Sequence, residues 1–350
     1  MRWLAAVCVI AKTAGIAMPA APVAARPTAD AALQALEWRL LKRIRECVRD
    51  YGMISAGETV AVAASGGKDS NALIYLLREM SARRLLGRET FDVRAVHLDQ
   101  KQPGHVPAPL ADWGRGLGIP FDLVEEDTYS IVVEKTAPTK SSAAVSHFCD
   151  FERLTPSTEV LPTPSTRRRY CGLCSRLRRG ILYTHTQQIG AQRLALGHHR
   201  DDALETLLLN MVHQGTMKAM PARYVASRGV DVIRPLMYCA EDDLREYATR
   251  LEFPILPCNL CGSQPAGKPS QRQGAKQLLH FLDAFGGDGE DVRENMLRAL
   301  SDVRPSHLLD RDLRGACGLD PCTGEPVDDQ AARIFRAPGG DDDDELGIRR

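Results

Sequence analysis

The chain has 350 residues, of which 44% are hydrophobic, and it carries equal numbers of Lys+Arg and Asp+Glu, 45 of each. This length allows one large domain with appended segments or two domains, and the apolar content suffices for a substantial core. The formal net charge of zero excludes a global basic signature of nucleic-acid binding, so an RNA surface would have to come from local charge. Ten cysteines in so long a chain do not indicate a small disulfide scaffold.

Residues 1–30 contain no Asp or Glu before Asp30 and are dominated by Ala, Val, Ile and Pro. An early Arg2 followed by small apolar residues is typical of a signal or transit peptide. Lys12 interrupts the apolar run, so we do not expect a membrane span. The segment is predicted to be a targeting or disordered extension.

The segment from 31 onward carries the pattern of an α/β domain. A strand is predicted at 60–64, a helix at 71–77 after a short loop, and further strands at 93–98 and 121–124. Strands separated by helical stretches predict a doubly wound parallel sheet, which binds ligands beyond the carboxyl ends of its strands. A helix before the first strand is predicted by apolar residues at helical spacing: Leu36, Leu40, Leu41, Ile44 and Val48.

A short polar loop, Ser65-Gly66-Gly67-Lys68-Asp69-Ser70, joins the first strand to its helix. Its glycines let the backbone come close to a ligand, and the free N–H groups at the helix start suit a phosphate. Its spacing matches neither a Walker A sequence nor a Rossmann glycine motif. Asp99 ends the second strand and should lie on the same functional edge as this loop.

Residues 136–166 are rich in Ser, Thr, Pro and Ala, which predicts a flexible insertion in which Cys149 is incidental. A cysteine pair, Cys171 and Cys174, then leads into a basic helix. A strand at 194–196 opens onto two histidines and two aspartates, followed by a helix at 203–213. Asp201 and Asp202 at this helix start have two interpretations, as site carboxylates or as capping acids.

The remaining chain is predicted to contain an exposed basic loop at 217–223, a strand at 232–236 and a helix at 241–251. A second cysteine pair, Cys258 and Cys261, follows, and then helices at 271–285 and 292–303. Residues 310–350, which include Cys317 and Cys322, are predicted to be a disordered acidic tail. One domain is therefore expected over 31–309, interrupted by the insertion at 136–166.

The two cysteine pairs are separated by far more than the ~15 to 20 residues of a compact zinc ribbon. The fold must therefore assemble any shared site. Four thiolates suit zinc, thiolates also hold iron–sulfur clusters, and redox or structural thiols are a third interpretation. Spacing alone leaves these alternatives open.

Several motifs in this order resemble one family. They are the loop Ser65–Ser70, the segment Leu98–Gly104, the cysteine pair with its Ser-Arg-Leu-Arg-Arg-Gly continuation, the segment Gly197–Asp202, the segment Ile233–Leu236 and the segment Cys258–Gln264. Together they resemble the tRNA 2-thiocytidine biosynthesis (TtcA) family of PP-loop ATP pyrophosphatases, over about residues 58–135 and 170–309. The resemblance implies the adenine nucleotide alpha hydrolase-like form of the doubly wound sheet. The N-terminal extension, the insertion and the tail depart from the family pattern.

The resemblance implies an enzyme that thiolates cytidine 32 of the tRNA anticodon loop, using ATP and Mg²⁺ and passing through an adenylated cytidine. It implies a [4Fe-4S] cluster held by Cys171, Cys174 and Cys261, with Cys258 as a neighbour, and a sulfide bound to that cluster. Candidate catalytic residues are Lys68, Asp69 and Asp201. The nucleotide-binding residues expected are Ser65, Gly66, Gly67, Lys68, Asp69, Ser70 and Asp99.

Basic residues after the first cysteine pair and in the loop 217–223 are expected to contact tRNA phosphates, namely Arg178, Arg179, Lys218 and Arg223. A cysteine desulfurase as sulfur source, a homodimer and a cytoplasmic location are further expectations of the family, although the N-terminal extension leaves mitochondrial or plastid import open. The alternatives are a PP-loop 2-thiouridine or lysidine synthetase, and a zinc-dependent RNA-binding protein without catalysis.

Overall fold

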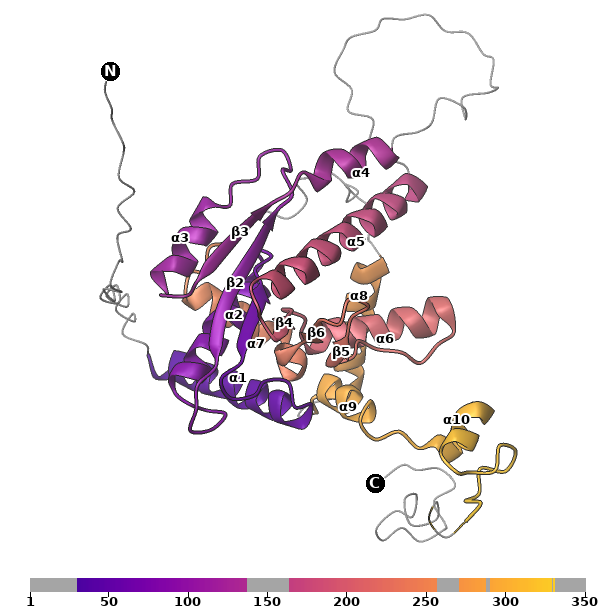
Figure 1. Cartoon of the computed structure of the whole chain (residues 1–350). Coiled ribbons are helices and arrows are strands. Elements are labelled where there is room, and N and C mark those ends of the chain that lie inside the picture. Colours follow the sequence, from indigo (N-terminus) through magenta and orange to yellow (C-terminus); the bar gives the residue numbers. More distant parts are fainter. Residues whose placement is uncertain (1–29, 137–163, 257–270, 288–289, 329, 331–350) are drawn as a thin grey trace, which may run out of the picture. The chain divides into compact units, whose positions relative to one another are not determined.

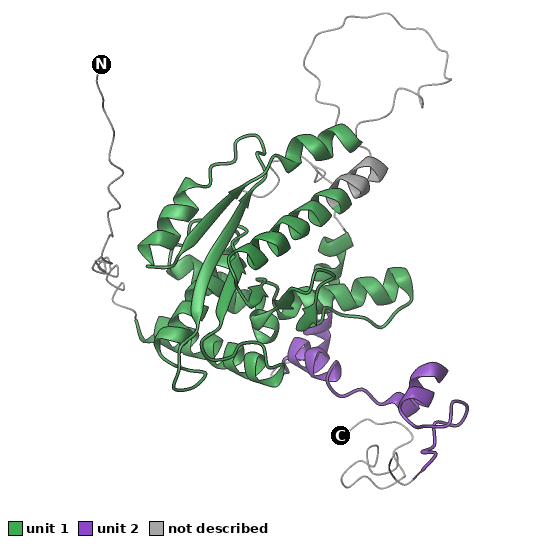
Figure 2. Ribbon diagram, in the orientation of Figure 1, with its two compact units in different colours: residues 1–278 green, residues 279–350 purple. Residues whose placement is uncertain are grey.

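The computed structural model describes residues 30–136, 164–256, 271–287, 290–328 and 330, and it describes no side chains for 164–171. The chain divides into two compact units, residues 1–278 and 279–350 (Figure 2). The helices up to this boundary are α1 (Ala31–Asp50), α2 (Lys68–Ala82), α3 (Ala108–Gly116), α4 (Thr128–Thr136), α5 (Pro164–Gln188), α6 (Arg200–Gln214) and α7 (Glu241–Arg250), with α8 (Gln271–Gly286) containing it. None of the described helices is both long and apolar enough to cross a membrane.

The first unit is built on one six-stranded sheet (Figure 1). Its strands follow the spatial order β3-β2-β1-β4-β6-β5, and every pairing is parallel except that of β5 with β6. Their bounds are β1 (Thr59–Ala63), β2 (Asp92–Asp99), β3 (Phe121–Glu125), β4 (Arg193–Ala195), β5 (Arg223–Val225) and β6 (Asp231–Ile233). The predicted doubly wound α/β sheet is confirmed, with one antiparallel edge strand.

Strand β1 separates two apolar cores, because successive side chains of a strand point to opposite faces. Val60 and Val62 belong to the core that includes buried residues of α1, α2 and α7. Ala61 and Ala63 belong to the second core, where Leu182 of α5 is buried. Helices therefore cover both faces of the sheet, which explains why β1 reads as a continuous apolar run in the sequence.

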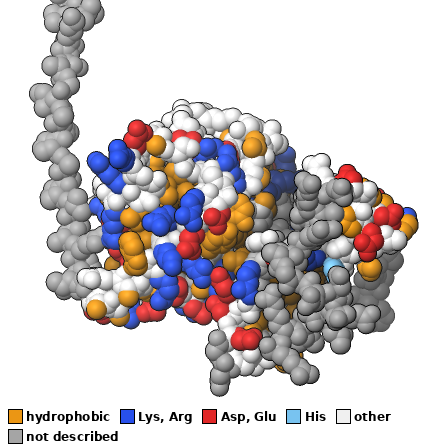
Figure 3. Space-filling model, turned by 90° about the horizontal axis from the view of Figure 1, so that it is seen from below, with side chains coloured by type: hydrophobic (Ala, Val, Ile, Leu, Met, Phe, Trp, Pro, Cys, Tyr) orange, Lys and Arg blue, Asp and Glu red, His pale blue; other side chains and the backbone are white. Residues whose placement is uncertain are grey.

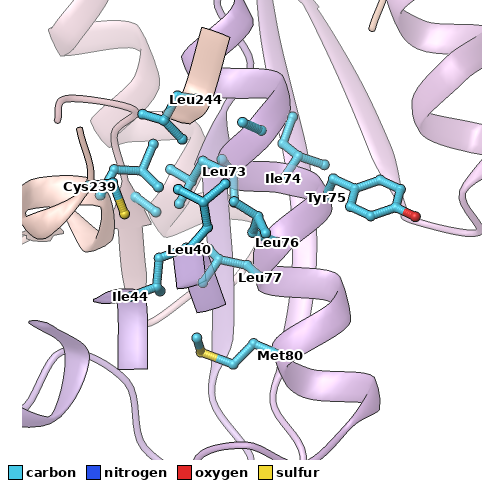
Figure 4. Packing of buried hydrophobic residues seen from close by; sticks show 14 of the residues in the cluster. Leu40, Ile44, Leu73, Ile74, Tyr75, Leu76, Leu77, Met80, Cys239 and Leu244 are labelled. Carbon is cyan, nitrogen blue, oxygen red and sulfur yellow. The ribbon is translucent and has the colours of Figure 1, made fainter. Parts of the chain in front are cut away.

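The larger core encloses apolar side chains of α2 (Figure 4). Leu73, Leu76 and Leu77 of α2 are fully buried, as are Leu40 and Ile44 of α1. The helix thus packs apolar residues around most of its surface, as a helix enclosed by neighbours requires. The start of α2 is fixed in space by this packing.

The chain adds strands to one side of β1 first and to its other side afterwards. The chain leaves β1 toward β2 and β3 on one side, and it returns to β4 on the other. Loops that leave the carboxyl ends of β1 and β4 therefore face each other across the switch point where sheets of this kind bind ligands. The loop 65–70 follows β1, and Gly197 to His199 follow β4.

Several sequence predictions differ from the structure in this unit, among them the strand predicted at 232–236, which ends at Ile233 and is followed by the 3-10 helix η2 (Pro235–Tyr238). Cys171 and Cys174 lie within α5 and not ahead of it, because the helix already begins at Pro164 and so includes the last residues of the predicted insertion. Proline at a first helical position is favourable, since its missing N–H would have no partner there. Arg223 lies in β5, an antiparallel strand paired with β6, and not in a loop. The rest of the insertion, including Cys149, lies outside the described residues.

The second unit contains α9 (Val292–Ala299), the short 3-10 helix η3 (Pro305–His307) and α10 (Arg311–Ala316). The prediction of disorder from residue 310 is wrong for α10 and the turn after it. Asp310 caps α10 by accepting from the N–H of Leu313, and Asp320 accepts from the N–H groups of Cys322 and Thr323. Aspartates thus satisfy backbone groups locally, without a large apolar core.

We predict that Leu73→Ala destabilises the protein by roughly 2 to 5 kcal/mol, because Leu73 is fully buried and a cavity would remain. Urea unfolding measures the free energy change. Val212→Ala on α6 is the control, since Val212 is 67% exposed and should change stability by less than about 0.5 kcal/mol. Equal losses in the two variants would contradict this description of the core.

Candidate functional site

The loop 65–70 forms a closed polar turn at the start of α2. Ser65 Oγ lies 2.9 Å from Ser70 Oγ and accepts from the N–H of Gly67 at 3.3 Å, and Ser70 Oγ donates to the carbonyl of Gly67 at 2.9 Å. The two serines therefore hold each other across the turn. Gly67 itself is the N-cap of α2 and has no side chain that could occupy the helix N-terminus.

Two glycines let other segments approach this turn closely. Gly66 has a φ of +80°, and a Cβ atom there would lie 2.8 Å from side-chain atoms of Leu256. A Cβ on Gly197, at the end of β4, would lie 3.0 Å from the backbone nitrogen of Ser70. The loop thus depends on glycine at both positions, one for conformation and one for space.

Lys68 lies between two carboxylates. Its Nζ donates to Asp69 Oδ2 at 3.0 Å and to Glu241 Oε1 at 3.1 Å, and the side chain is only 22% exposed. Burial lowers the pKa of Lys68, but these carboxylates more than offset that effect, so the net shift is upward. Lys68 therefore carries a positive charge held at the helix start, where an anionic ligand would meet it.

The segment that leads from β4 into α6 contributes a histidine and carboxylates next to the loop 65–70. Asp201 is 1% exposed, and its Oδ2 accepts from the N–H of Glu241 at 2.8 Å, so it fixes the start of α7. His199, the N-cap of α6, has Nε2 3.9 Å from Asp69 Oδ1 and 3.5 Å from Asp202 Oδ2. Asp69 Oδ1 is buried and has no hydrogen-bond partner among the described residues. An oxygen in this state is suited to a cation ligand.

Helix α8 contributes two cations to the same cluster. Lys276 Nζ lies 2.9 Å from Glu241 Oε2, and Arg272 Nε lies 3.0 Å from Glu205 Oε2. Glu205 is 1% exposed, and burial raises its pKa although Arg272 and Lys276 oppose the shift. The charged groups of the site thus come from α2, α6, α7 and α8.

The carboxyl end of β2 brings a cysteine to this edge of the sheet. Asp99 is 6% exposed and accepts from the backbone N–H of Lys101 at 2.8 Å and from its Nζ at 3.0 Å. Gln100 donates from Nε2 to Thr128 Oγ1 at 2.8 Å and to Cys174 Sγ at 3.3 Å. Cys174 is a free, half-buried thiol. Cys174 of α5 therefore contacts the residue that follows β2, and the loop 65–70 follows the neighbouring strand β1.

A histidine pair and an arginine lie near these groups. His97 Nδ1 is 2.6 Å from the carbonyl of Ala64, and its Nε2 is 2.9 Å from His105 Nε2. Burial lowers the pKa of His97, and the nearby charge of Arg178 lowers it further. Burial also lowers the pKa of Arg178, while the neighbouring Cys174 raises it. Arg178 therefore lies on the Cys174 side of α5, one helical turn from that thiol.

The other basic residues predicted to bind RNA are spread over separate elements. Arg179 is exposed and donates from Nε to the carbonyl of Ser175, and Lys218 is exposed in the segment after α6. Arg223 is tied to Asp231, with Nη2 and Oδ2 2.6 Å apart. Figure 3 shows one face on which Lys and Arg side chains are interspersed with Asp and Glu.

Of the expected cluster ligands, the structure describes the thiol of Cys174. Cys171 lies in α5, but its side chain is outside the described set, and Cys258 and Cys261 lie in the undescribed range 257–270. Within the described residues no three His, Cys, Asp or Glu side chains form a metal-binding group.

Several residues of the site were absent from the sequence prediction. Glu205, Glu241, Arg272 and Lys276 meet only through folding, because they come from three helices far apart in the chain. Gly197 carries no signal that distinguishes a close approach from an ordinary turn.

Comparison with known proteins gives matches along most of the chain. A family model described as a PP-loop domain matches residues 171–255. The tRNA-cytidine(32) 2-sulfurtransferase of Nitrosospira multiformis is 43% identical over 299 residues, covering 85% of this chain and 88% of that protein. The protein of the same name from Anaeromyxobacter dehalogenans is 40% identical over 320 residues, covering 90% and 97%.

A solved structure shares the fold. The U34-tRNA thiolase NcsA from Methanococcus maripaludis, solved with its [4Fe-4S] cluster, has a TM-score of 0.53 and 20% sequence identity. The similarity covers 76% of this chain and 80% of that chain. At this identity the likeness supports the sheet architecture described above.

We predict that Gly66→Ala destabilises the protein by roughly 1 to 3 kcal/mol, because a side chain at its positive φ is strained and collides with Leu256. Gly67→Ala is the matched control. Gly67 has a φ of −85°, and its nearest contact would be Ser65 Oγ at 3.5 Å, so Gly67→Ala loses only the preference for glycine over alanine at an N-cap and should cost less than Gly66→Ala, about 0.5 to 1 kcal/mol. Chemical unfolding of both variants measures the difference, and a reversed order would contradict the loop geometry.

We predict that the stabilisation from Glu241 depends on pH. Burial raises the pKa of Glu241, but Lys276 and Lys68 more than offset this and lower it from 4.5 to about 2. A lowered pKa means that the stabilisation is complete above the unfolded value of 4.5 and is lost as the pH falls toward 2. Glu241→Gln should therefore cost about 1 to 3 kcal/mol near neutral pH and progressively less in acid. Urea unfolding over a pH series tests this, and a cost that does not shrink in acid would be inconsistent with it.

Proposed function

We propose a function on one premise: this chain belongs to the family of the tRNA-cytidine(32) 2-sulfurtransferases. The protein catalyses the ATP-dependent thiolation of cytidine 32 in tRNA, forming 2-thiocytidine. The observation that carries this proposal is the juxtaposition of Cys174 with Gln100 at the end of β2, beside the loop that follows β1. The site thus has a candidate for activation and a candidate for sulfur transfer on one sheet edge.

The loop 65–70 is proposed to bind ATP. Gly66 and Gly67 leave room for phosphates at the start of α2, and the N–H groups there favour negative charge. The C2 oxygen of cytidine attacks the α-phosphate, and the bond between the α and β phosphates breaks with its electron pair moving to the departing pyrophosphate. Lys68 stabilises the charge that develops on the phosphates.

Asp69 is proposed to bind Mg²⁺ together with the nucleotide phosphates. Its Oδ1 is buried without a hydrogen-bond partner among the described residues, and Mg²⁺ usually takes one or two carboxylates along with phosphate oxygens. Asp201 acts as a positioning residue, since its Oδ2 accepts from the backbone N–H of Glu241. Asp99 is proposed to shape the nucleotide side of the β2 edge through its contacts with Lys101.

The sulfur half of the reaction is proposed to use a [4Fe-4S] cluster held by Cys171, Cys174 and Cys261. When bound, such a cluster would supply an iron position that is free of protein ligand and can carry sulfur. Gln100 orients the Cys174 thiol through its 3.3 Å contact. Replacement of AMP by sulfur at C2 completes the reaction and leaves the original C2 oxygen on AMP.

The tRNA is proposed to approach over α5 and the segment after α6. Arg178 lies beside Cys174, and Arg179 and Lys218 are exposed, so these three could meet phosphates of the anticodon stem-loop. Arg223 contributes through its exposed part, since its guanidinium is held by Asp231. A cysteine desulfurase as sulfur donor, a homodimer and a cytoplasmic location complete the proposal from the family.

We predict that Asp69→Asn and Cys174→Ser abolish 2-thiocytidine formation in different ways. Asp69→Asn should retain the visible absorption of the cluster, because Asp69 lies in the loop and not among the thiols. Cys174→Ser should lose that absorption and still bind ATP. The measurements are nucleoside mass spectrometry of tRNA and absorption spectra of anaerobically purified protein.

The control for these variants is the wild-type chain purified in the same way. A colourless wild-type protein with stoichiometric zinc and no iron would contradict the cluster assignment. Full thiolation by Asp69→Asn would remove Asp69 from the reaction.

A further inference from the structure

A second lysine lies beside Lys68, outside all predicted site residues. Lys276 Nζ donates to Glu241 Oε1 at 3.1 Å and to Oε2 at 2.9 Å. Lys68 Nζ donates to the same Oε1 at 3.1 Å. The two ammonium nitrogens are therefore separated by no more than twice 3.1 Å. Glu241 thus holds a pair of cations next to the start of α2.

The helix that carries Lys276 is anchored by a second carboxylate. Arg272 lies one turn earlier on α8, and its Nε is 3.0 Å from Glu205 Oε2. Lys276 Nζ is also 3.7 Å from Glu205 Oε1. Arg272 Nη2 lies 3.6 Å from Asp202 Oδ1. Ion pairs to α6 and α7 therefore fix the position of both α8 cations.

The acidic and the basic side chains of this group differ in solvent exposure. Glu205 is 1% exposed and Glu241 is 12% exposed, whereas the side chains of Lys276 and Arg272 are 41% and 50% exposed. Neither oxygen of Glu205 has a hydrogen bond within the described part of the chain. Burial of a carboxylate in this state is unfavourable, so its benefit lies in orienting the cations above it. The exposed charges of this group are therefore the positive ones of Lys276 and Arg272, which favours binding of an anion.

We propose that Lys276 binds the β and γ phosphates of ATP together with Lys68, and that Glu241 is the positioning residue for both lysines. This inference rests on the proposed function, because it takes the loop 65–70 as the nucleotide site. Cleavage between the α and β phosphates transfers negative charge to the departing pyrophosphate, and a pair of ammonium groups stabilises that charge better than one. We assign the nucleotide and not an RNA phosphate as the ligand of Lys276. The reason is that Glu241 contacts both Lys276 and Lys68 of the loop 65–70.

Binding to two nucleotides tests the assignment of Lys276. Calorimetry with α,β-methylene ATP and with AMP is carried out on the full chain and on Lys276→Ala, Lys276→Arg and Lys42→Ala. Lys42 is an exposed lysine of α1 and serves as the charge-matched control. We expect Lys276→Ala to weaken binding of the ATP analogue about 10-fold and to leave AMP binding unchanged, because AMP lacks the β and γ phosphates. Lys276→Arg should restore most of the affinity.

Each alternative result has a defined meaning. Unchanged affinity of Lys276→Ala for the ATP analogue overturns the inference, and so does an equal loss for the analogue and AMP, which a misfolded variant would also produce. Should Lys276→Ala fail to fold, Lys276→Gln replaces it in the same comparison. A loss of tRNA affinity with intact nucleotide affinity would assign Lys276 to RNA phosphates. A wild-type chain that binds neither nucleotide contradicts the proposed function itself.

Steady-state kinetics test the positioning role of Glu241. Glu241→Gln leaves the two lysines without their shared counter-charge, so the KM for ATP should rise about 5-fold while the KM for tRNA stays unchanged. A general structural defect would lower kcat and alter both KM values. An unchanged KM for ATP would remove Glu241 from this role.

Discussion

The site depends on the close approach of two backbones at the switch point of the sheet. Gly197 at the end of β4 lies so near the start of α2 that a Cβ atom would be 3.0 Å from the backbone nitrogen of Ser70. Because β1 and β4 are parallel neighbours, their carboxyl ends bring the loop 65–70 and the segment from His199 to Asp202 to one place. Without this approach, Asp201 could not hold the start of α7, nor Glu241 contact Lys68.

Charge balance is the second organising feature. The loop gathers carboxylates from α2, α6 and α7, and a polyphosphate would be repelled by them without compensation. Lys68, Arg272 and Lys276 offset these charges and lie nearer to solvent than Glu205 and Glu241. The buried carboxylates therefore contact the cations, and the cations form the more exposed part of the site.

The parallel sheet and the strand–loop–helix arrangement around residues 65–70 could be predicted from sequence, because apolar runs and glycine turns are local signals. The sequence also predicts the position of the loop residues and Asp99 at this sheet edge, since the loop follows β1 and Asp99 ends β2; their role in nucleotide binding stays a proposal. Glu205, Glu241 and Lys276 could not be found, because their meeting depends on how α6, α7 and α8 pack. The ordered turn around Asp320 was missed for another reason: its stability comes from side-chain to backbone hydrogen bonds and not from apolar periodicity.

The central claim is that the C2 oxygen of cytidine is activated as an adenylate at the loop 65–70. The most direct test supplies the anaerobically purified protein with ATP, a sulfur source and a tRNA anticodon stem-loop that carries ¹⁸O at C2 of cytidine 32. Mass spectrometry then follows the label. The account predicts that every 2-thiocytidine formed is matched by one AMP that contains the ¹⁸O. Label found in inorganic phosphate or in water, with unlabelled AMP, would contradict it.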